Sequence, residues 1–220
     1  MKGQKIIVVG GGAAGLMAAG QAALEGAETI LLEKMKRPGR KICISGKGRC
    51  NLTNVAELSE FIHHFGKTGR FLRQSFTRFF SKELMTFFNE LGLDLVTERG
   101  GRVFPASGKA PEVLAVLLAW LEQCGVKVQT SSAVDSLLVA DGRIKGVVCK
   151  GREIACDAVI LTTGGASYPA TGSTGDGYAL AQVAGHTLIP IRPALVPLET
   201  FESVTAKMAD LNLRHVNVRM

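Results

Sequence analysis

Three glycines and one acidic residue have the types and the spacing of a dinucleotide site. Gly10, Gly12 and Gly15 form a Gly-x-Gly-x-x-Gly pattern, and Glu33 follows eighteen residues after the last of them. In such a pattern the first glycine allows a tight turn, the second lets the backbone approach a pyrophosphate, and the third lets a helix lie close to a strand. A carboxylate at Glu33 can accept hydrogen bonds from the hydroxyls of an adenosine ribose and would repel a 2′-phosphate. The pattern predicts a site for NAD or FAD and does not choose between them.

The elements predicted around these residues can position them. Residues 6–9 form an apolar run of the right length for a buried parallel strand, and residues 13–24 are mostly strong helix formers. Gly26 is placed to end this helix, and residues 29–32 form a second apolar strand that leads to Glu33. Strand, turn, helix and strand follow one another within about thirty residues, as in the βαβ unit that binds phosphates at a helix N-terminus.

Positive charge is concentrated in one stretch that begins just after Glu33. The chain has 26 Lys and Arg against 19 Asp and Glu, a net charge of +7. Residues 34–82 hold twelve of the basic residues against Glu57 and Glu60, a local +10, whereas the rest has 14 against 17, or −3. A general preference for nucleic acid should spread over a whole face, so the cluster indicates a local anionic ligand.

The first part of this stretch, RPGRKICISGKGRCNLTN at residues 37–54, is predicted to be a loop. Its glycines are interleaved with cations that could hold more of a long cofactor with a diphosphate. An exposed basic loop or an RNA-contacting patch is the alternative. No aromatic residue lies between residues 34 and 49 to stack on bases, which makes nucleic acid the less favoured partner.

Four segments resemble one known family: the βαβ unit ending at Glu33, RKICISGKGRCNLTN, GRVFPASGKAPEVLAVLL and AVILTTGGASYPATGSTGDGYALAQVAGH. Together they look like the bacterial YhiN/BaiN-like FAD-dependent oxidoreductases, over residues 4 to about 199. The resemblance implies a glutathione-reductase type of FAD-binding fold. It also implies an enzyme that passes reducing equivalents from NAD(P)H through FAD to an unsaturated organic acceptor, a small-molecule substrate.

The resemblance also implies where FAD would lie. Glu33 would hold the adenosine ribose. Four residues would line the pyrophosphate: Gly10, Gly12, Ala14 and Gly15. Residues of the basic stretch would follow the diphosphate, the ribityl chain and the flavin: Arg40, Lys41, Ser45, Gly46, Arg49, Cys50 and Asn51. Val134 would meet the adenine through its backbone, and a later segment would cross close to the cofactor: Thr162, Thr163, Gly164 and Gly165.

Two further candidates for cofactor contact are charged. Lys34 is the first cation after Glu33, and Asp176 lies in the turn Gly175-Asp176-Gly177, before a helical run at residues 178–184. A glycine turn that leads into a helix N-terminus can bind an anion, but Asp176 could equally be an ordinary helix cap. No side chain stands out as a general acid or base.

The later chain predicts an α/β fold in which a parallel sheet is joined by helices and an antiparallel β-meander. Pro111 is placed to begin a helix through residue 123, followed by a strand at residues 126–129. Asp141-Gly142 and Lys150-Gly151 indicate two successive hairpins, and residues 158–161 form another buried strand. The phenylalanine-rich residues 61–88 predict helices, either a cap over the sheet or a wall of the substrate pocket.

The cysteines and histidines predict neither a disulfide framework nor a metal site. The five cysteines are odd in number and form no Cys-x-x-Cys pair, and the four histidines lack metal-ligand spacing. Six residues separate Cys43 from Cys50, more than in the redox pairs of disulfide reductases, so Cys50 is expected to pack beside the flavin. Residues 6–24 contain five glycines, too many for a signal peptide or a membrane span. A cytoplasmic protein without a membrane partner is therefore expected.

Residues 1–190 are predicted to form the FAD-binding domain, and residues 191–220 the beginning of a second domain. Pro190, Pro193 and Pro197 are typical of a linker. The resembled family inserts a mostly β domain at this point and then returns to the FAD domain, so this chain is expected to be C-terminally truncated. Two alternatives to an active enzyme stay open: a dinucleotide-binding module without turnover, and a flavoprotein that acts on or with RNA.

Overall fold

The computed structural model describes residues 3–193 and Met208. The chain divides into two units, Met1–Thr187 and Leu188–Met220. All helices and strands given below belong to the first unit. The predicted second domain, residues 191–220, lies almost wholly outside the described residues.

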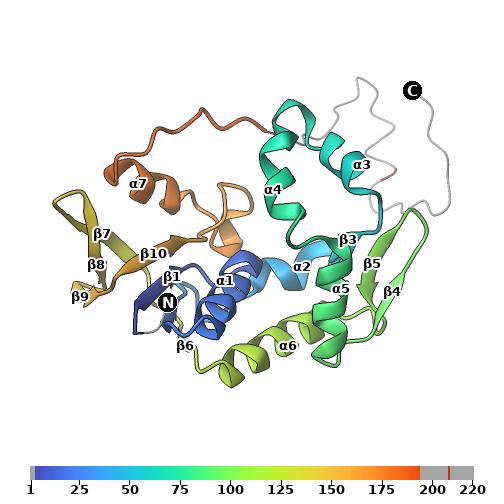
Figure 1. Cartoon of the computed structure of the whole chain (residues 1–220), viewed down its shortest axis with the longest axis horizontal. Helices are drawn as coiled ribbons and strands as arrows, with labels where there is room; N and C mark the ends of the chain where they lie inside the picture. The colour runs from blue at the N-terminus through green and yellow to red at the C-terminus, as the bar shows by residue number, and fades with distance from the viewer. Residues whose placement is uncertain (1–2, 194–207, 209–220) are drawn as a thin grey trace. The chain divides into compact units, whose positions relative to one another are not determined.

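A four-stranded parallel sheet organises the first unit (Figure 1). Its strands are β1 (Lys5–Val9), β2 (Glu28–Leu32), β6 (Lys127–Gln129) and β10 (Ala158–Leu161), in the order β10-β1-β2-β6. Val9 pairs in register with Leu32 on one side and Leu161 on the other, so three strands end at the same level. Ligands of such sheets bind beyond this carboxyl edge.

Side chains of β1 alternate between two cores, as the pleat of a strand requires. Ile6 and Val8 face a core that includes residues of α1 (Ala13–Leu24) and α6 (Ala110–Gln123). Ile7 and Val9 face a second core, which the parallel sheet shares with an antiparallel sheet. The antiparallel sheet consists of β7 (Val134–Ala140), β8 (Arg143–Cys149) and β9 (Arg152–Ala155). Both faces of β1 are therefore covered, which explains its uninterrupted apolar sequence.

The predicted α/β fold with its antiparallel meander is confirmed. The two hairpins turn at Asp141-Gly142 and Lys150-Gly151. All four of these turn residues have positive φ, between 51° and 70°, as a two-residue turn matched to the strand twist demands. Pro111 lies in the first turn of α6, as expected.

A second antiparallel sheet was not predicted, whereas the helices predicted for the phenylalanine-rich segment are present. The sheet has the order β3-β5-β4, with β3 (Thr53–Asn54), β4 (Leu95–Thr97) and β5 (Arg102–Pro105). The phenylalanine-rich segment is helical, in α3 (Leu58–His63), the 3₁₀ helix η1 (Gly66–Leu72), α4 (Arg73–Phe76) and α5 (Ser81–Glu90). Helix α5 contacts β3 and β4, and Phe87 stacks edge-on against Trp120 of α6. No helix in the described part is long and apolar enough to cross a membrane.

The prediction of a loop at residues 37–54 was wrong for its central part. Helix α2 (Arg40–Gly48) begins after Gly39, which has the left-handed φ of 66°, and buries Ile42. The chain leaves helical geometry at Ser45, and Gly46 and Lys47 are left-handed. Ile42 packs in the core from within a basic, glycine-rich sequence, and such tertiary packing can stabilise a short helix. The last elements before the second unit are η2 (Pro169–Thr171) and α7 (Asp176–Val183).

Candidate cofactor-binding site

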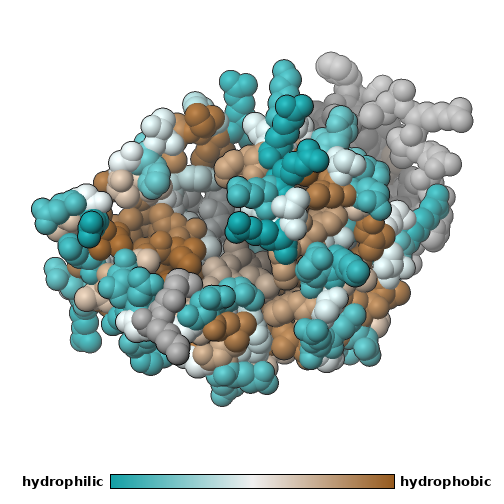
Figure 2. All heavy atoms as spheres, in the orientation of Figure 1, coloured by the Kyte–Doolittle hydropathy of each residue, from teal (hydrophilic) through white to brown (hydrophobic). Residues whose placement is uncertain are grey.

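A cavity of about 740 Å³ lies where β1, β2 and β10 end. Its volume is within the usual range for ligand pockets, about 300–1,000 Å³. Figure 2 shows a hollow near the centre of this view, with hydrophilic side chains on its right and hydrophobic ones on its left. Fifteen of the predicted site residues line the cavity: Gly10, Gly12, Ala14, Glu33, Lys34, Arg40, Lys41, Ser45, Cys50, Asn51, Val134, Thr162, Thr163, Gly164 and Asp176. Four predicted residues are not among its lining in the described chain: Gly15, Gly46, Arg49 and Gly165.

The glycine turn packs tightly on one side and is open on the other. A Cβ on Gly10 would lie 2.5 Å from the carbonyl oxygen of Thr162, directly after the neighbouring strand β10, and one on Gly15 would overlap the carbonyl oxygen of Gly10. Gly15 therefore lets α1 lie against the turn, behind the cavity surface. At Gly12, in contrast, a Cβ would meet nothing within 4 Å. Gly12 is also the N-cap of α1 and no side chain caps the helix, so the N–H groups of its first turn can bind an anion in the cavity.

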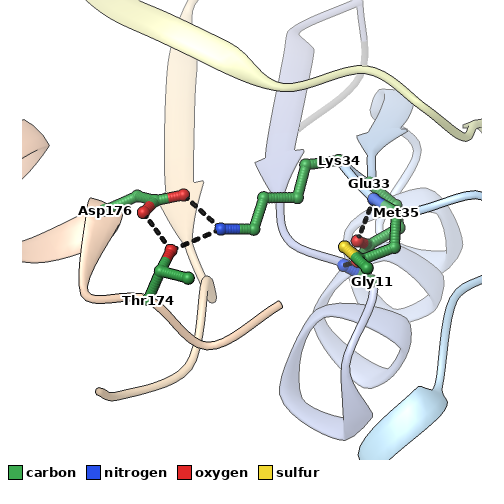
Figure 3. A network of polar contacts seen from close by, with 6 residues as sticks. All are labelled: Gly11, Glu33, Lys34, Met35, Thr174 and Asp176. Atoms are coloured by element: carbon green, nitrogen blue, oxygen red, sulfur yellow. Dashed lines mark hydrogen bonds and ion pairs between the residues drawn. The ribbon is translucent and has the colours of Figure 1, made fainter. Parts of the chain in front are cut away.

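Glu33 is a buried carboxylate at the end of β2, only 8% exposed. Its Oε2 accepts a hydrogen bond of 2.7 Å from the backbone N–H of Gly11, and its Oε1 accepts one of 2.7 Å from that of Met35 (Figure 3). These two bonds fix the plane of the carboxylate against the glycine turn. Each carboxylate oxygen has a second lone pair, so both can still accept a hydroxyl from a ligand in the cavity.

Lys34 and Asp176, two predicted cofactor contacts, bind each other. Lys34 Nζ lies 2.5 Å from Asp176 Oδ2 and donates a hydrogen bond of 2.6 Å to Thr174 Oγ1, across the space between β2 and α7 (Figure 3). The hydroxyl of Thr174 also donates to the Asp176 carboxylate. The hydrogen bond from Lys34 holds the pKa of Asp176 below its ordinary value, with a smaller contribution from Thr174. Asp176 is the first residue of α7 and makes no cap hydrogen bond, so the alternative of an ordinary helix cap was wrong.

A second lysine ties α2 to the same distant segment. Lys41 Nζ donates to Ser173 Oγ at 2.7 Å and to the carbonyl oxygen of Ser167 at 3.0 Å. Ser173 is a buried cavity residue that sequence reasoning missed, although its place before the turn Gly175-Asp176-Gly177 was a usable signal. Together the two lysines join the start of the basic stretch to residues 167–176.

The end of α2 contributes Ser45, Cys50 and Asn51 to the cavity wall. Cys50 is buried and has an unusual positive φ of 59°. Burial raises the pKa of its thiol above the ordinary value. Arg49 points elsewhere, because its guanidinium pairs with Glu98 and lies over the ring of Phe104.

Further cavity residues had no distinctive sequence signal. Leu84 and Phe88 of α5, and Val113 and Leu117 of α6, line an apolar part of the cavity. Apolar residues four positions apart on a helix are equally typical of an ordinary core. The cavity thus combines a polar end at the βαβ unit with an apolar part between helices.

The residues present fit FAD. A diphosphate would meet the uncapped N-terminus of α1 at Gly12, where no Cβ obstructs its approach, and Lys41 and Arg40 lie in the same wall. The fixed carboxylate of Glu33 suits the hydroxyls of a ribose. In the described part of the chain, no group of three or more His, Cys, Asp or Glu side chains is placed to hold a metal ion.

Comparisons with known proteins agree with this site. The chain matches the family described as HI0933-like protein Rossmann domain over residues 4–213. It is 39% identical over 209 residues to the 3-dehydro-bile acid delta(4,6)-reductase of Clostridium scindens, covering 93% of this chain and 50% of that protein. It is 30% identical over 206 residues to the ribosomal RNA dihydrouridine synthase of Haemophilus influenzae, covering 91% of this chain and 51% of that protein. The chain therefore spans about half the length of the curated relatives it matches.

Solved structures show the same fold at lower sequence identity. The 3-ketosteroid-delta4-(5alpha)-dehydrogenase of Rhodococcus jostii RHA1 matches with a TM-score of 0.61 and 18% identity, over 84% of this chain and 55% of that one. A flavocytochrome c3 fumarate reductase in its open conformation matches with a TM-score of 0.60 and 24% identity, over 83% and 41%. The match over residues 4–213 means that this chain belongs to the HI0933-like, or YhiN/BaiN, family of FAD-dependent oxidoreductases and carries its Rossmann domain.

Proposed function

We propose that this chain is the FAD-binding part of a reductase that passes reducing equivalents from NAD(P)H through FAD to an unsaturated organic acceptor. One observation carries the proposal: the cavity beyond β1, β2 and β10 combines an open helix N-terminus at Gly12 with the fixed carboxylate of Glu33. An anion site and a hydroxyl acceptor in one cavity suit the diphosphate and the ribose of an adenosine diphosphate. Bound FAD would supply the hydride chemistry of the reaction.

The residues of this chain bind and orient the cofactor in this proposal. The first turn of α1 holds the diphosphate through backbone N–H groups, and Glu33 accepts the ribose hydroxyls. Lys41, Arg40 and the turn that contains Ser45, Cys50 and Asn51 continue the site toward the flavin. Val134, at the start of β7, and Thr162 to Gly164, directly after β10, complete the lining of the site.

The acceptor class is supported by the names of two relatives. One is a delta(4,6)-reductase of a 3-dehydro-bile acid and the other a dihydrouridine synthase of ribosomal RNA, and each name describes hydrogen added to a substrate. All five cysteines are free thiols, and we infer that the protein works in the reducing cytoplasm.

The test is a titration of the purified chain with FAD, followed by quenching of flavin fluorescence and by the visible spectrum of the protein after gel filtration. The proposal expects saturable binding of one FAD per chain. A chain that takes up no FAD would contradict the assignment. Where FAD binds, anaerobic mixing with NADH or NADPH distinguishes a reductase, in which the flavin bleaches, from a binding module without turnover, in which it stays oxidised.

A substrate within RNA is the second candidate, favoured by the ribosomal RNA relative and by exposed aromatic side chains in one segment. Phe65, Phe71 and Phe79 are 46%, 87% and 40% exposed, and Lys67 and Arg70 lie in the same segment. Exposed aromatics among cations are typical of surfaces that bind single-stranded RNA. Binding of an RNA oligonucleotide should then weaken steeply between low and moderate salt. Phe71→Ala should lower the affinity at low salt and have a smaller effect on this salt dependence. Absence of binding at low salt would remove this candidate.

A further inference from the structure

The turn at residues 45–51 has a conformation that needs support from outside. Ser45 has the extended ψ of 151°, and Lys47 and Cys50 have positive φ of 57° and 59° although neither is glycine. Gly46 and Gly48 are also left-handed. Non-glycine residues adopt this region only where the surrounding structure imposes it. Within the turn, the N–H of Cys50 donates to the carbonyl of Ser45 at 3.0 Å.

The outside support comes from the hairpin of β4 and β5, through Arg49. Its Nη2 lies 2.5 Å from Glu98 Oε1 and its Nη1 lies 3.2 Å from Glu98 Oε2, so the pair is bidentate. The same guanidinium lies 4.2 Å from the centre of the Phe104 ring, on β5. Immediately after the turn, the N–H of Leu52 donates to the carbonyl of Val103 at 2.9 Å. The turn is therefore fastened to the hairpin at two successive points.

Arg49 is well suited to a fixed ion pair. Both charged side chains are half-buried, with 41% and 32% of their surface exposed. Isolated exposed pairs contribute little, but bidentate geometry with a stacked guanidinium is the exception. Arg49 is also outside the cavity lining, whereas Ser45, Cys50 and Asn51 on either side of it are within.

We propose that Arg49 and Glu98 form a clamp that holds the turn at residues 45–51 against the cavity, so that Glu98 and Arg49 are positioning residues for the cofactor. This inference rests on the proposed FAD site and goes beyond it. It assigns a role to Glu98, on a hairpin whose side chains had no predicted part in binding. It also gives Arg49 an indirect role in place of the direct contact expected from the sequence.

The first test needs no cofactor and uses Cys50 as a reporter of the turn. The chain is alkylated with iodoacetamide, and the modification of Cys50 is followed by mass spectrometry of its peptide. Buried Cys149 of β8 serves as the internal reference for global opening. Glu98→Gln should speed the alkylation of Cys50 by at least about fivefold, within the usual range of pairwise coupling, and leave that of Cys149 unchanged. Equal acceleration at both cysteines, or none at Cys50, would overturn the clamp.

Two further variants sharpen this test. Glu28→Gln removes the same charge from a more exposed ion pair with a single contact, Glu28 with Lys127 at 2.8 Å, between residues that do not line the cavity. It should leave the alkylation of Cys50 unchanged. Exchange of the partners, Arg49→Glu with Glu98→Arg, should make the alkylation of Cys50 slower than in either single variant. Rescue is incomplete because the exchange removes the contact of the guanidinium with Phe104.

The second test asks whether the clamp serves the cofactor. Glu98→Gln should weaken FAD binding at least about fivefold and shift the visible bands of bound flavin, with Glu28→Gln unchanged. Faster alkylation of Cys50 with unaltered FAD affinity and spectrum would refute the role in cofactor positioning. If the parent chain binds no FAD, the proposed function fails, and the alkylation of Cys50 still decides whether the clamp exists.

Discussion

Glu33 has two roles, one in hydrogen bonds to the backbone and one in the proposed contact with the ribose. Glu33→Gln tests both, because glutamine keeps the size and shape of the side chain but loses its charge. The carboxylate accepts one backbone hydrogen bond on each oxygen, from Gly11 and from Met35. An amide can accept only one of them, and its NH₂ group must face the other N–H. A hydrogen bond to a charged group contributes about 1.5–3 kcal/mol, so the free energy of unfolding should fall by about 2–3 kcal/mol.

The effect on FAD is calculated in the same way. A neutral amide in place of the carboxylate weakens the hydrogen bonds to the ribose by about 1–2 kcal/mol, so the dissociation constant should rise about 5- to 30-fold. The assays are urea unfolding of the cofactor-free chain and titration with FAD. Glu25→Gln, at the exposed C-terminal end of α1, is the matched control and should change neither.

An FAD analogue whose adenosine lacks the 2′-hydroxyl distinguishes a ribose contact from a general loss of structure. The parent chain should bind this analogue more weakly than FAD, and Glu33→Gln should discriminate less between the two. Equal discrimination by both proteins would refute the ribose assignment. An unchanged unfolding free energy would refute the importance of the two backbone hydrogen bonds.

Three further predictions concern the same cavity. Gly15→Ala should destabilise the cofactor-free chain by about 1–3 kcal/mol in urea unfolding, because its Cβ would overlap Gly10. Gly12→Ala should change stability by less than about 1 kcal/mol and lower only the affinity for FAD. Lys41→Gln should weaken FAD binding about three- to tenfold and reduce its salt dependence, whereas Lys36→Gln, an exposed residue of the same basic stretch, should do neither. Asp176→Asn should remove at most about 1 kcal/mol at neutral pH, since the pair with Lys34 is partly exposed. Because Lys34 lowers the pKa of folded Asp176, this difference from the parent should persist above the ordinary aspartate pKa of about 3.9 and vanish as pH falls through the lowered value; a difference that persists in acid would contradict the ion pair.

The parts of the fold that were predictable have local causes. The βαβ unit from β1 to Glu33 follows from apolar runs and glycines within a short segment, and both hairpins of the meander follow from two-residue turns. Helix α2 was missed because its composition is that of a loop, and the core contacts of Ile42 with residues distant in sequence are not visible in that composition. Strands β3, β4 and β5 have two to four residues each, too few for an alternating pattern.

The site, too, has a part that the sequence predicts and a part that it does not. The glycine pattern and the family resemblance located fifteen of the 37 residues that line the cavity, including Val134 and Thr162. They could not reveal the pairing of Lys34 with Asp176, 142 positions apart, or that of Arg49 with Glu98, 49 positions apart. Such pairs depend on the tertiary structure, and the type of either residue does not indicate its partner.

The pairing of β1 with β10 has a consequence for how the protein is made. One edge of β1 pairs with β2, which follows it closely in the chain, but its other edge pairs with β10, where Ile6 lies opposite Ala158. At a synthesis rate of about 5–20 residues per second, β10 is synthesised roughly 8 to 30 s after β1, and until then this edge of β1 is unpaired. During that time an apolar strand with unpaired backbone groups is a template for pairing with other chains. Thr162 and residues after it complete the lining of the cavity, so a cofactor can stabilise this fold only after they have been synthesised.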